Sequence, residues 1–195
     1  MHASSLRHMS DLATRYLAGR SMLRVADLGS QDVNGSYRPL FDCPGWQYVG
    51  IDLVAGSNVD VVLPSPYRFP FRNGTFDLVV SGQAFEHVEY FWLTWLEMVR
   101  LLSPGGMIFL IAPSRGPEHR FPVDCWRFYP DAYAALARYA NLELLEAKTD
   151  WAPAPELDSA PWGDSVGVFR KPVRQSLRER LRFRIRCWLG RRLTV

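Results

Sequence analysis

The sequence predicts an α/β protein with a doubly wound, mostly parallel sheet of seven strands and an antiparallel last strand. Two observations predict this class. Short apolar runs of strand length alternate along the chain with segments whose apolar residues recur at helical spacing. The run at 76–81 is almost entirely apolar, as expected for a parallel strand that is covered on both faces. Each helix between two strands carries the chain back, so that successive strands can pair in parallel.

The predicted elements follow each other in the order that such a sheet needs. A first helix is expected at 4–19, where apolar residues follow helical spacing and Gly19 provides a stop. Strands are predicted at 25–28, 48–51, 59–63, 76–81 and 107–112, with a closing pair at 142–147 and 165–169. Further helices are predicted at 36–41, 90–102 and 131–140, with a turn at 104–106. The whole order predicts a Rossmann-like sheet with helices on both faces.

The composition indicates one soluble globular domain. The chain has 195 residues, of which 48% are hydrophobic and 22% charged, a balance typical of proteins with a packed core. No window approaches the ~18 consecutive apolar residues of a membrane span, and the first residues lack the apolar core of a signal peptide. Cys43, Cys125 and Cys187 lie far apart, which favours reduced thiols. We therefore expect a cytoplasmic protein.

The positive charge is concentrated at the end of the chain. Residues 170–195 contain ten basic residues and one acid, so the rest has 13 basic and 19 acidic residues and is negatively charged. A mildly acidic body argues against nucleic acid as a partner. The sequence thus divides into a domain at 1–170, which includes the N-terminal helix, and a basic amphipathic tail at 171–195.

The tail is predicted to form a helix over 174–193. Arginines occupy most positions of this segment, and apolar residues recur between them at helical spacing. These apolar residues are Leu177, Leu181, Ile185, Trp188 and Leu189. This pattern is typical of helices that lie on anionic lipid, and it predicts a peripheral contact with the inner face of a membrane. The alternative is that the helix packs on the domain itself or on a second subunit, which would make the protein a homodimer.

The first strand ends in a glycine turn that can approach a ligand closely. Gly29 lets the backbone bend sharply, and the amides of the residues up to Gly35 follow it. Asp27 can accept a hydrogen bond from an ammonium group, and Asp52, at the end of the second strand, can accept two ribose hydroxyls. Alternatively, Asp27 only shapes the turn and Asp52 is a solvated loop acid. A nicotinamide-binding dehydrogenase is disfavoured, because Gly29 and Gly35 do not fit its G-x-G-x-x-G spacing.

Six fragments together carry a resemblance to a known family. They are DLGS at 27–30, GID at 50–52, FPF at 69–71, NGTFD at 73–77, FEHV at 85–88 and LLSPGG at 101–106. In this order and spacing, residues 20–170 resemble the class I S-adenosylmethionine-dependent methyltransferases. The chain departs from that family in its glycine turn, where Asn34-Gly35-Ser36 stands in for missing glycines. It also has Ser65 where many members place an acid against the adenine amine.

The resemblance implies S-adenosylmethionine as the cofactor and residues 1–170 as the domain that binds it. It implies that adenine is recognised by backbone groups near Ser65 to Tyr67, and that Leu53 covers an adenine face. The implied cofactor-binding residues are Asp27, Gly29, Ser30, Asn34, Gly35, Asp52, Leu53, Ser65, Tyr67 and Ser81.

Chemistry is expected on the loops that follow the fourth and fifth strands. A methyl acceptor that is an alcohol has to lose a proton to a general base or through a metal ion. His119 and His87 are the candidate bases, although His87 could equally only shape the pocket. A divalent ion, Mg²⁺, would be held by some of Glu86, His87, His119 and Asp124. The residues expected to bind the acceptor are Glu86, Arg115, Arg120, Asp124, Trp126 and Arg127.

The segment PVDCWRFYPD at 122–131 resembles methyltransferases of bacterial glycan gene sets. It implies O-methylation of a sugar hydroxyl on a saccharide or glycan precursor, within polysaccharide biosynthesis. Two alternatives remain open. The protein could be an N- or C-methyltransferase of a small metabolite, which needs no base at its nucleophile. It could also be a non-catalytic partner protein that binds the cofactor and uses the tail for interaction.

Overall fold

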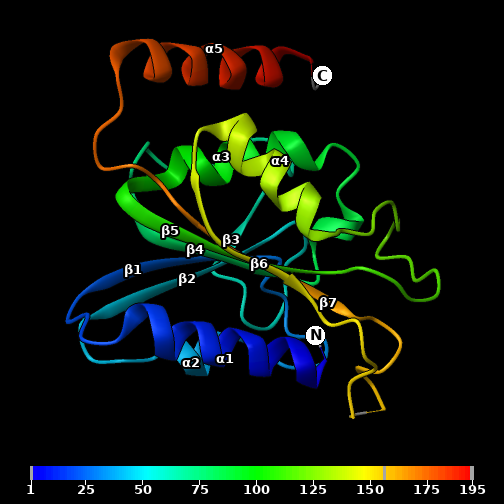
Figure 1. The fold of residues 1–195 in the computed structure, drawn as a ribbon. Helices are drawn as coiled ribbons and strands as arrows, with labels where there is room; N and C mark the ends of the chain where they lie inside the picture. Colours follow the sequence, from blue (N-terminus) through cyan, green and yellow to red (C-terminus); the bar gives the residue numbers. More distant parts are fainter. Residues whose placement is uncertain (1, 156, 194–195) are drawn as a thin grey trace.

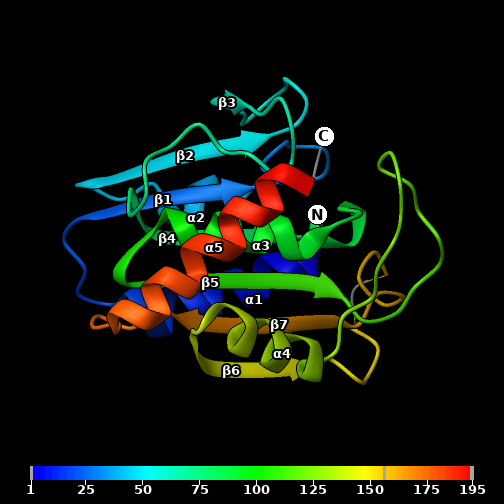
Figure 2. The same cartoon turned by 90° about the horizontal axis from the view of Figure 1, so that it is seen from above.

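One mixed sheet of seven strands forms the centre of the molecule. The computed structural model describes residues 2–155 and 157–193. The strands are β1 (Leu23–Leu28), β2 (Trp46–Asp52), β3 (Val61–Val62), β4 (Phe76–Gly82), β5 (Leu102–Pro113), β6 (Glu143–Thr149) and β7 (Asp164–Arg170). They lie in the order β3-β2-β1-β4-β5-β7-β6, and Figure 2 shows this order across the sheet. Only β7 runs antiparallel to its neighbours, β5 and β6, which confirms the predicted fold class.

Helices cover both faces of the sheet. The helices are α1 (Ala3–Leu17), α2 (Arg38–Phe41), α3 (Phe91–Leu101), α4 (Pro130–Ala140) and α5 (Leu177–Leu193), with a short 3-10 turn, η1 (Phe85–His87). Figure 1 shows α1 and α2 on one face and α3 and α4 on the other, with α5 as an outer layer beyond α3. Because strand side chains alternate between faces, Leu78 and Val80 join the core under α1, whereas Val79 joins the core under α3.

The elements occur where the sequence predicts them, with two informative differences. The predicted turn at 104–106 lies inside β5, which begins at Leu102 directly after α3. Gly105 adopts φ +80°, and the pairing register shifts between Phe76 and Leu78, so the strand absorbs the irregularity without ending. The third strand is reduced to two residues, Val61 and Val62, at the sheet edge.

The parallel strands place several loops along one edge of the sheet, namely the edge that is formed by their carboxyl ends. The carboxyl ends of β1, β2, β4 and β5 point the same way, so the loops that follow them gather there. The N-terminal end of α1 reaches the same edge (Figure 2). Residues from distant parts of the chain therefore meet at this edge.

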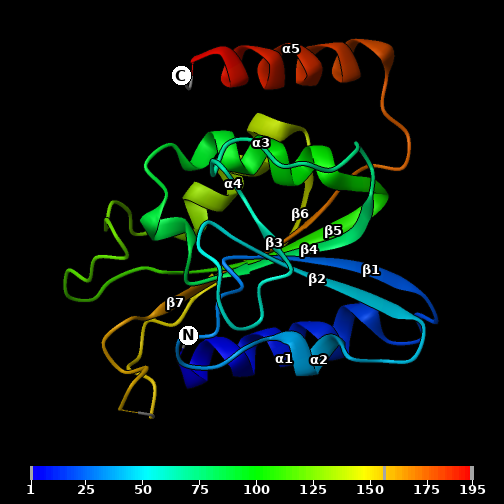
Figure 3. The ribbon, with the colours of Figure 1, turned by 180° about the vertical axis from the view of Figure 1, so that it is seen from behind.

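A buried carboxylate joins α5 to the domain. The side chain of Glu97 on α3 is 3% exposed and accepts hydrogen bonds from Arg100, from the backbone amide of Phe69 at 3.0 Å and from Arg191 on α5 at 2.9 Å. Gly190 lets α5 approach closely, since a Cβ there would lie 2.7 Å from a methyl group of Leu93. Figure 3 shows α5 lying over α3. This arrangement matches the alternative in which the tail helix packs on the domain itself.

We expect Glu97→Ala to lower the free energy of unfolding by about 3 kcal/mol, because Arg100 would be left as an unpaired, buried charge. Urea titration followed by circular dichroism measures this difference. Glu143→Ala is the matched control. Its partner is Arg170, both side chains are about half exposed, and the change should stay below about 1 kcal/mol. Equal losses in the two variants would refute a special role for Glu97.

Candidate functional site

A cavity of about 620 Å³ opens at the carboxyl edge of the sheet. Its walls come from the loops after β1, β2, β4 and β5, from the loop between β6 and β7, and from the start of α1. One half is lined by the turn after β1 and the end of β2. The other half is lined by His2, His87, His119, Phe121 and Trp162. The cavity therefore joins a loop of nucleotide-binding type to a second compartment rich in aromatic rings.

The turn after β1 depends on the absence of a side chain at Gly29. Gly29 has φ +80°, and a Cβ there would lie 2.5 Å from the Cβ of Ala84. The amides of Gly29 and Ser30 both donate to the carbonyl oxygen of Ile51, at 2.9 and 3.2 Å. The turn is thus held down between the ends of β2 and β4, and Gly35, at φ +119°, continues it.

Asp27 presents an unpartnered oxygen at the cavity. Its side chain is buried, and Oδ2 accepts a hydrogen bond from the hydroxyl of Tyr48. Among the described residues, Oδ1 has no hydrogen-bond partner. Burial raises the pKa of Asp27 to about 7, against the opposing effect of the Tyr48 hydrogen bond. A cationic ligand group would satisfy Oδ1 and favour the charged carboxylate.

Asp52 connects the first two loops of the site. Its Oδ1 accepts from the amide of Leu53 at 2.7 Å, and its Oδ2 accepts from the amide of Gln31 at 3.0 Å. Asn58 reinforces the same junction by donating to the carbonyl oxygen of Ser30 at 2.8 Å. The carboxylate is therefore fixed at the cavity wall, with further acceptor capacity for ligand hydroxyls.

Two histidines stand together in the second compartment. The rings of His87 and His119 are 4.7 Å apart between centroids, and the ring of His119 is 4.4 Å from that of Trp162. His87 Nδ1 lies 2.6 Å from the carbonyl oxygen of Val123, which can only accept, so Nδ1 carries the proton and Nε2 is free to accept. Burial lowers the pKa of His87, which favours the neutral imidazole.

Asp124 holds the loop that carries His119. It accepts two hydrogen bonds from Arg127, at 2.6 and 2.8 Å, and one from the backbone amide of His119 at 2.8 Å. The Arg127 hydrogen bonds keep the pKa of Asp124 well below its usual range. The ion pair therefore stabilises the loop in its present course across the cavity.

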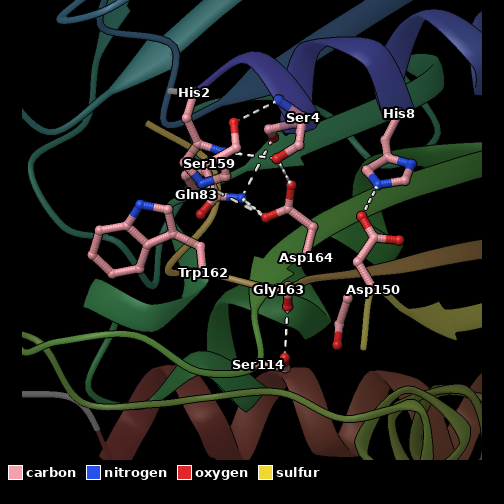
Figure 4. Close-up of polar contacts among 12 residues, drawn as sticks. His2, Ser4, His8, Gln83, Ser114, Asp150, Ser159, Trp162, Gly163 and Asp164 are labelled. Carbon is pink, nitrogen blue, oxygen red and sulfur yellow. Dashed lines mark hydrogen bonds and ion pairs between the residues drawn. The ribbon is translucent and has the colours of Figure 1, made fainter. Parts of the chain in front are cut away.

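A buried network around Asp164, shown in Figure 4, fixes the cavity wall at the start of α1. Asp164 accepts from Ser4 at 2.6 Å and from Gln83 at 2.9 Å, while the amide of Ser4 donates to Ser159 at 3.0 Å. These bonds tie the start of α1 to the loop before β7. They hold the stacked rings of His2 and Trp162 at the cavity.

The structure brings together half of the residues that the sequence singles out. The predicted residues that line the cavity are Asp27, Gly29, Ser30, Asn34, Gly35, Asp52, Leu53, His87 and His119. Those that do not line it are Ser65, Tyr67, Ser81, Glu86, Arg115, Arg120, Asp124, Trp126 and Arg127.

Three predicted cofactor residues have structural contacts elsewhere. The hydroxyl of Ser81 is buried and donates to the carbonyl oxygen of Leu28, which joins β4 to β1. Ser65 accepts from the amide of Tyr67, and the Tyr67 hydroxyl accepts from the amide of Tyr90 beside α3. The neighbouring residues Leu63 and Pro66 line the cavity instead.

The predicted acceptor residues also serve the loop rather than the cavity. Trp126 donates to the carbonyl oxygen of Val88 and Arg115 donates to that of Trp151, both at 3.0 Å. Arg120 is paired with Glu118, and both side chains are more than 60% exposed. These side chains were assigned from their residue types and their position after β5, which could not show that they point away from the cavity.

Sequence reasoning missed His2, Gln83 and Trp162. His2 precedes the predicted first helix, and Trp162 lies in a proline-rich connection between the two closing strands that is too long for a tight hairpin. Neither segment has a motif. The position of Trp162 immediately before Gly163 and the last strand is the one available signal, because this antiparallel strand begins beside the carboxyl end of β5.

Comparisons with known proteins show which families and structures this chain is similar to. Residues 27–110 match the family model described as a methyltransferase domain. Over these residues, somewhat less than half of its length, the chain is similar to methyltransferase domains. It is 27% identical, over 77% of its length, to an uncharacterised methyltransferase of Mycobacterium leprae, and it spans about 60% of that relative. It is 26% identical to the chloroplastic tocopherol O-methyltransferase of Arabidopsis thaliana, over 77% of this chain and 49% of the relative.

A solved structure shows the same fold. The 1,6-didemethyltoxoflavin-N1-methyltransferase of Burkholderia thailandensis, with 1,6-didemethyltoxoflavin and S-adenosylhomocysteine bound, superposes with a TM-score of 0.68 at 19% identity. The match covers 87% of this chain and 79% of that one. That structure holds S-adenosylhomocysteine, the product form of S-adenosylmethionine, which is the cofactor that the sequence predicts for this chain.

The residues of the cavity fit that cofactor. The unpartnered Oδ1 of Asp27 suits its ammonium group, and the fixed carboxylate of Asp52 suits a ribose diol. The turn at Gly29 has no room for a side chain, so the backbone itself forms the wall there. When bound, the cofactor supplies an activated methyl group, and the chain has to orient the acceptor toward it.

The affinity of the protein for S-adenosylhomocysteine should rise as the pH increases through about 7. Below this pH the buried Asp27 is neutral, and only its ionised form attracts the ligand's ammonium group. Asp27→Asn should flatten the rise and weaken binding roughly tenfold or more, as expected for the loss of a hydrogen bond between charged groups. Isothermal titration calorimetry across the pH range measures both effects. Asp42→Asn, at an exposed position, is the control. A wild-type profile in Asp27→Asn would exclude this role.

Proposed function

We propose that the protein transfers the methyl group of S-adenosylmethionine to a hydroxyl group of a small acceptor, with a saccharide as the favoured class. The observation that carries this proposal is the pair of imidazoles, His87 and His119, in the same cavity as Asp27 and Asp52. An alcohol has to lose its proton as it accepts the methyl group, and neutral imidazole is a common proton acceptor in proteins. We place the loss of that proton at this histidine pair.

The second compartment suits a sugar ring. The indole of Trp162 offers a flat apolar surface beside His119, and Phe121 and His2 add further rings. Aromatic faces suit the C–H faces of a sugar, while the imidazoles can accept from its hydroxyls. The loop arginines that would favour an anionic acceptor, Arg115, Arg120 and Arg127, bond to other groups of the chain. A neutral saccharide therefore fits better than a phosphorylated one.

The named acceptors of the similar proteins differ. One relative is named for O-methylation of tocopherol, and the similar solved structure is named for methylation at a nitrogen. The preference for oxygen in this chain therefore rests on the histidine pair. Residues 1–170 would form the catalytic domain, with acceptors taken from solution or from a precursor of a surface glycan.

We expect His119→Ala to lower kcat on the acceptor by about 100-fold or more, the usual contribution of a positioned proton acceptor. The assay is release of S-adenosylhomocysteine with a panel of monosaccharides and oligosaccharides. Arg120→Ala is the control, since its exposed side chain lies outside the cavity, and it should retain wild-type turnover. Turnover on amines alone, with His119→Ala unimpaired, would favour an N-methyltransferase and refute the proposal.

We also propose that α5 places the enzyme on an anionic membrane surface. Five apolar side chains on this helix are 46–79% exposed; they are Leu177, Leu181, Ile185, Trp188 and Leu189. The opposite side of the helix packs on the domain through Phe183, and Arg191 on that side reaches Glu97. The apolar residues therefore point outward in a fixed orientation. Among the described residues, no helix is both long and apolar enough to cross a bilayer.

The charge around this surface favours lipid over a second copy of the chain. The exposed residues Arg178, Arg182 and Arg192 lie among the apolar ones, and Arg192 stands over the ring of Trp188 at 4.4 Å. Two such faces brought together in a homodimer would repel each other. Anionic head groups would neutralise the arginines while the apolar side chains enter the interface. This position would suit an acceptor that is attached to lipid.

The double variant Leu181→Ser/Trp188→Ser should bind vesicles of phosphatidylcholine and phosphatidylglycerol roughly tenfold less well or worse, because it removes apolar surface that the bilayer would bury. Co-sedimentation measures the binding. Met22→Ser, which removes an exposed apolar side chain away from α5, should bind as the wild type does. Wild-type chain that stays in the supernatant at low salt, or a dimer that disappears only in the double variant, would contradict the membrane proposal.

A further inference from the structure

Glu86 is a fully buried carboxylate whose side chain has no hydrogen-bond partner in the part of the chain that the structure describes. It lies on η1, next to His87, and has no exposed surface. Within residues 2–155 and 157–193, neither carboxylate oxygen has a hydrogen-bond partner. The backbone around it is held firmly, because its carbonyl oxygen accepts from the amides of Cys125 and Trp126 at 2.7 and 3.2 Å. A buried acid is unfavourable in such surroundings unless another group satisfies it.

Two imidazoles face the same point as Glu86. A side-chain oxygen of Glu86 and one ring nitrogen each of His87 and His119 lie within 4.8 Å of one another. The hydrogen bond from His87 Nδ1 to the carbonyl oxygen of Val123 fixes this ring and leaves Nε2 free, 3.7 Å from Glu86 Oε1. In the described part of the chain, the buried Nδ1 of His119 has no hydrogen-bond partner either. Three potential ligands with unused lone pairs therefore converge.

We propose that Glu86, His87 and His119 bind one divalent transition metal ion of the zinc type. Two imidazole nitrogens and one carboxylate are a donor set that Zn²⁺, Co²⁺ and Mn²⁺ accept, whereas Mg²⁺ prefers oxygen ligands. The hydrogen bond of His87 Nδ1 to a backbone carbonyl is the kind of outer contact that orients metal-bound histidines. This assignment replaces the magnesium expected from the sequence.

Asp124 is not a fourth ligand. Its two oxygens are engaged by Arg127 and by the backbone amide of His119, and its Oδ2 lies 3.4 Å from His119 Nδ1. It orients the loop and the ring of His119 from outside the cluster. Three protein ligands leave a coordination position open, and His87 and His119 both line the cavity. An acceptor oxygen could occupy that position.

The catalytic role of the ion deepens the proposed function and rests on it. The binding of the ion to these three residues does not depend on the proposed function. A hydroxyl group that coordinates a divalent cation loses its proton more readily. The imidazoles would then act as ligands that hold the ion, and the ion would acidify the acceptor hydroxyl. The proton would then pass to solvent water rather than to an imidazole, as the acceptor oxygen takes the methyl group. Substitution of His119 would still impair turnover, because it removes a ligand of the ion.

The experiment is a titration of the chelator-treated, full-length protein with ZnSO₄, MnCl₂ and MgCl₂ in a calorimeter, with metal analysis of the protein as purified. We expect one Zn²⁺ per chain, with Mg²⁺ bound at least 100-fold more weakly. Co²⁺ should give the visible absorption bands of a coordinated ion. Glu86→Gln and His119→Ala should each weaken Zn²⁺ binding at least tenfold and remove those bands.

Two control variants test the assignment of the ligands. Cys125→Ser removes a thiol near the loop, and His8→Ala removes a histidine from a separate group with Asp150 and Asp164. Both should bind Zn²⁺ as the wild type does. Binding of S-adenosylhomocysteine by Glu86→Gln checks that this variant is folded, since the cofactor half of the cavity is formed by other residues.

The outcomes separate this site from the proposed function. Zn²⁺ binding at wild-type strength in both Glu86→Gln and His119→Ala, or no stoichiometric binding at all, would overturn the site. Stoichiometric Zn²⁺ with methyl transfer that is unchanged after chelation would overturn the role of the ion. Stoichiometric Zn²⁺ in a protein that methylates no saccharide would support the site and refute the proposed acceptor.

Discussion

The close approach of the chain at Gly29 is the constraint on which the site depends. A side chain at this position would overlap Ala84, so only glycine lets the end of β1 lie against the residues after β4. This contact sets the distance between the turn that would hold the cofactor and the short segment that carries Glu86 and His87. The two amides at Gly29 and Ser30, which share the carbonyl oxygen of Ile51, tie the same turn to β2. One backbone junction thus aligns three strand ends.

Buried carboxylates separate the parts of the molecule that are structural from those that are open to a ligand. Glu97 and Asp164 are buried with hydrogen-bond donors from several elements, and they join α5 and α1, respectively, to the domain. Asp27 and Glu86 are equally buried, yet each has at least one oxygen with no partner among the described residues. Burial raises the pKa of both, to about 7 and about 8. A buried acid that is not satisfied within the chain is where a cationic group would be stabilised.

The sequence predicted the cofactor half of the site more completely than the acceptor half. Asp27, Gly29, Gly35 and Asp52 lie where a strand ends, and the regular geometry of a parallel sheet brings such positions together. The acceptor half depends on the course of the loop between β5 and α4, which regular hydrogen-bonding patterns do not determine. Trp126 was expected in the cavity but packs on Phe91 in the structure, while Trp162 comes from a connection without a motif.

The sequence by itself determined the fold class, the order of strands and helices and the glycine turn, because periodicity and turn residues act locally along the chain. Only the tertiary structure decided that the start of α1 forms a wall of the cavity. It further decided that Asp124 pairs with Arg127, while the side chain of Glu86 has no hydrogen-bond partner among the described residues. It also decided that α5 packs through Phe183 and leaves Leu181 and Trp188 exposed. These outcomes depend on contacts between residues that are far apart in the sequence, and local residue spacing does not determine such contacts.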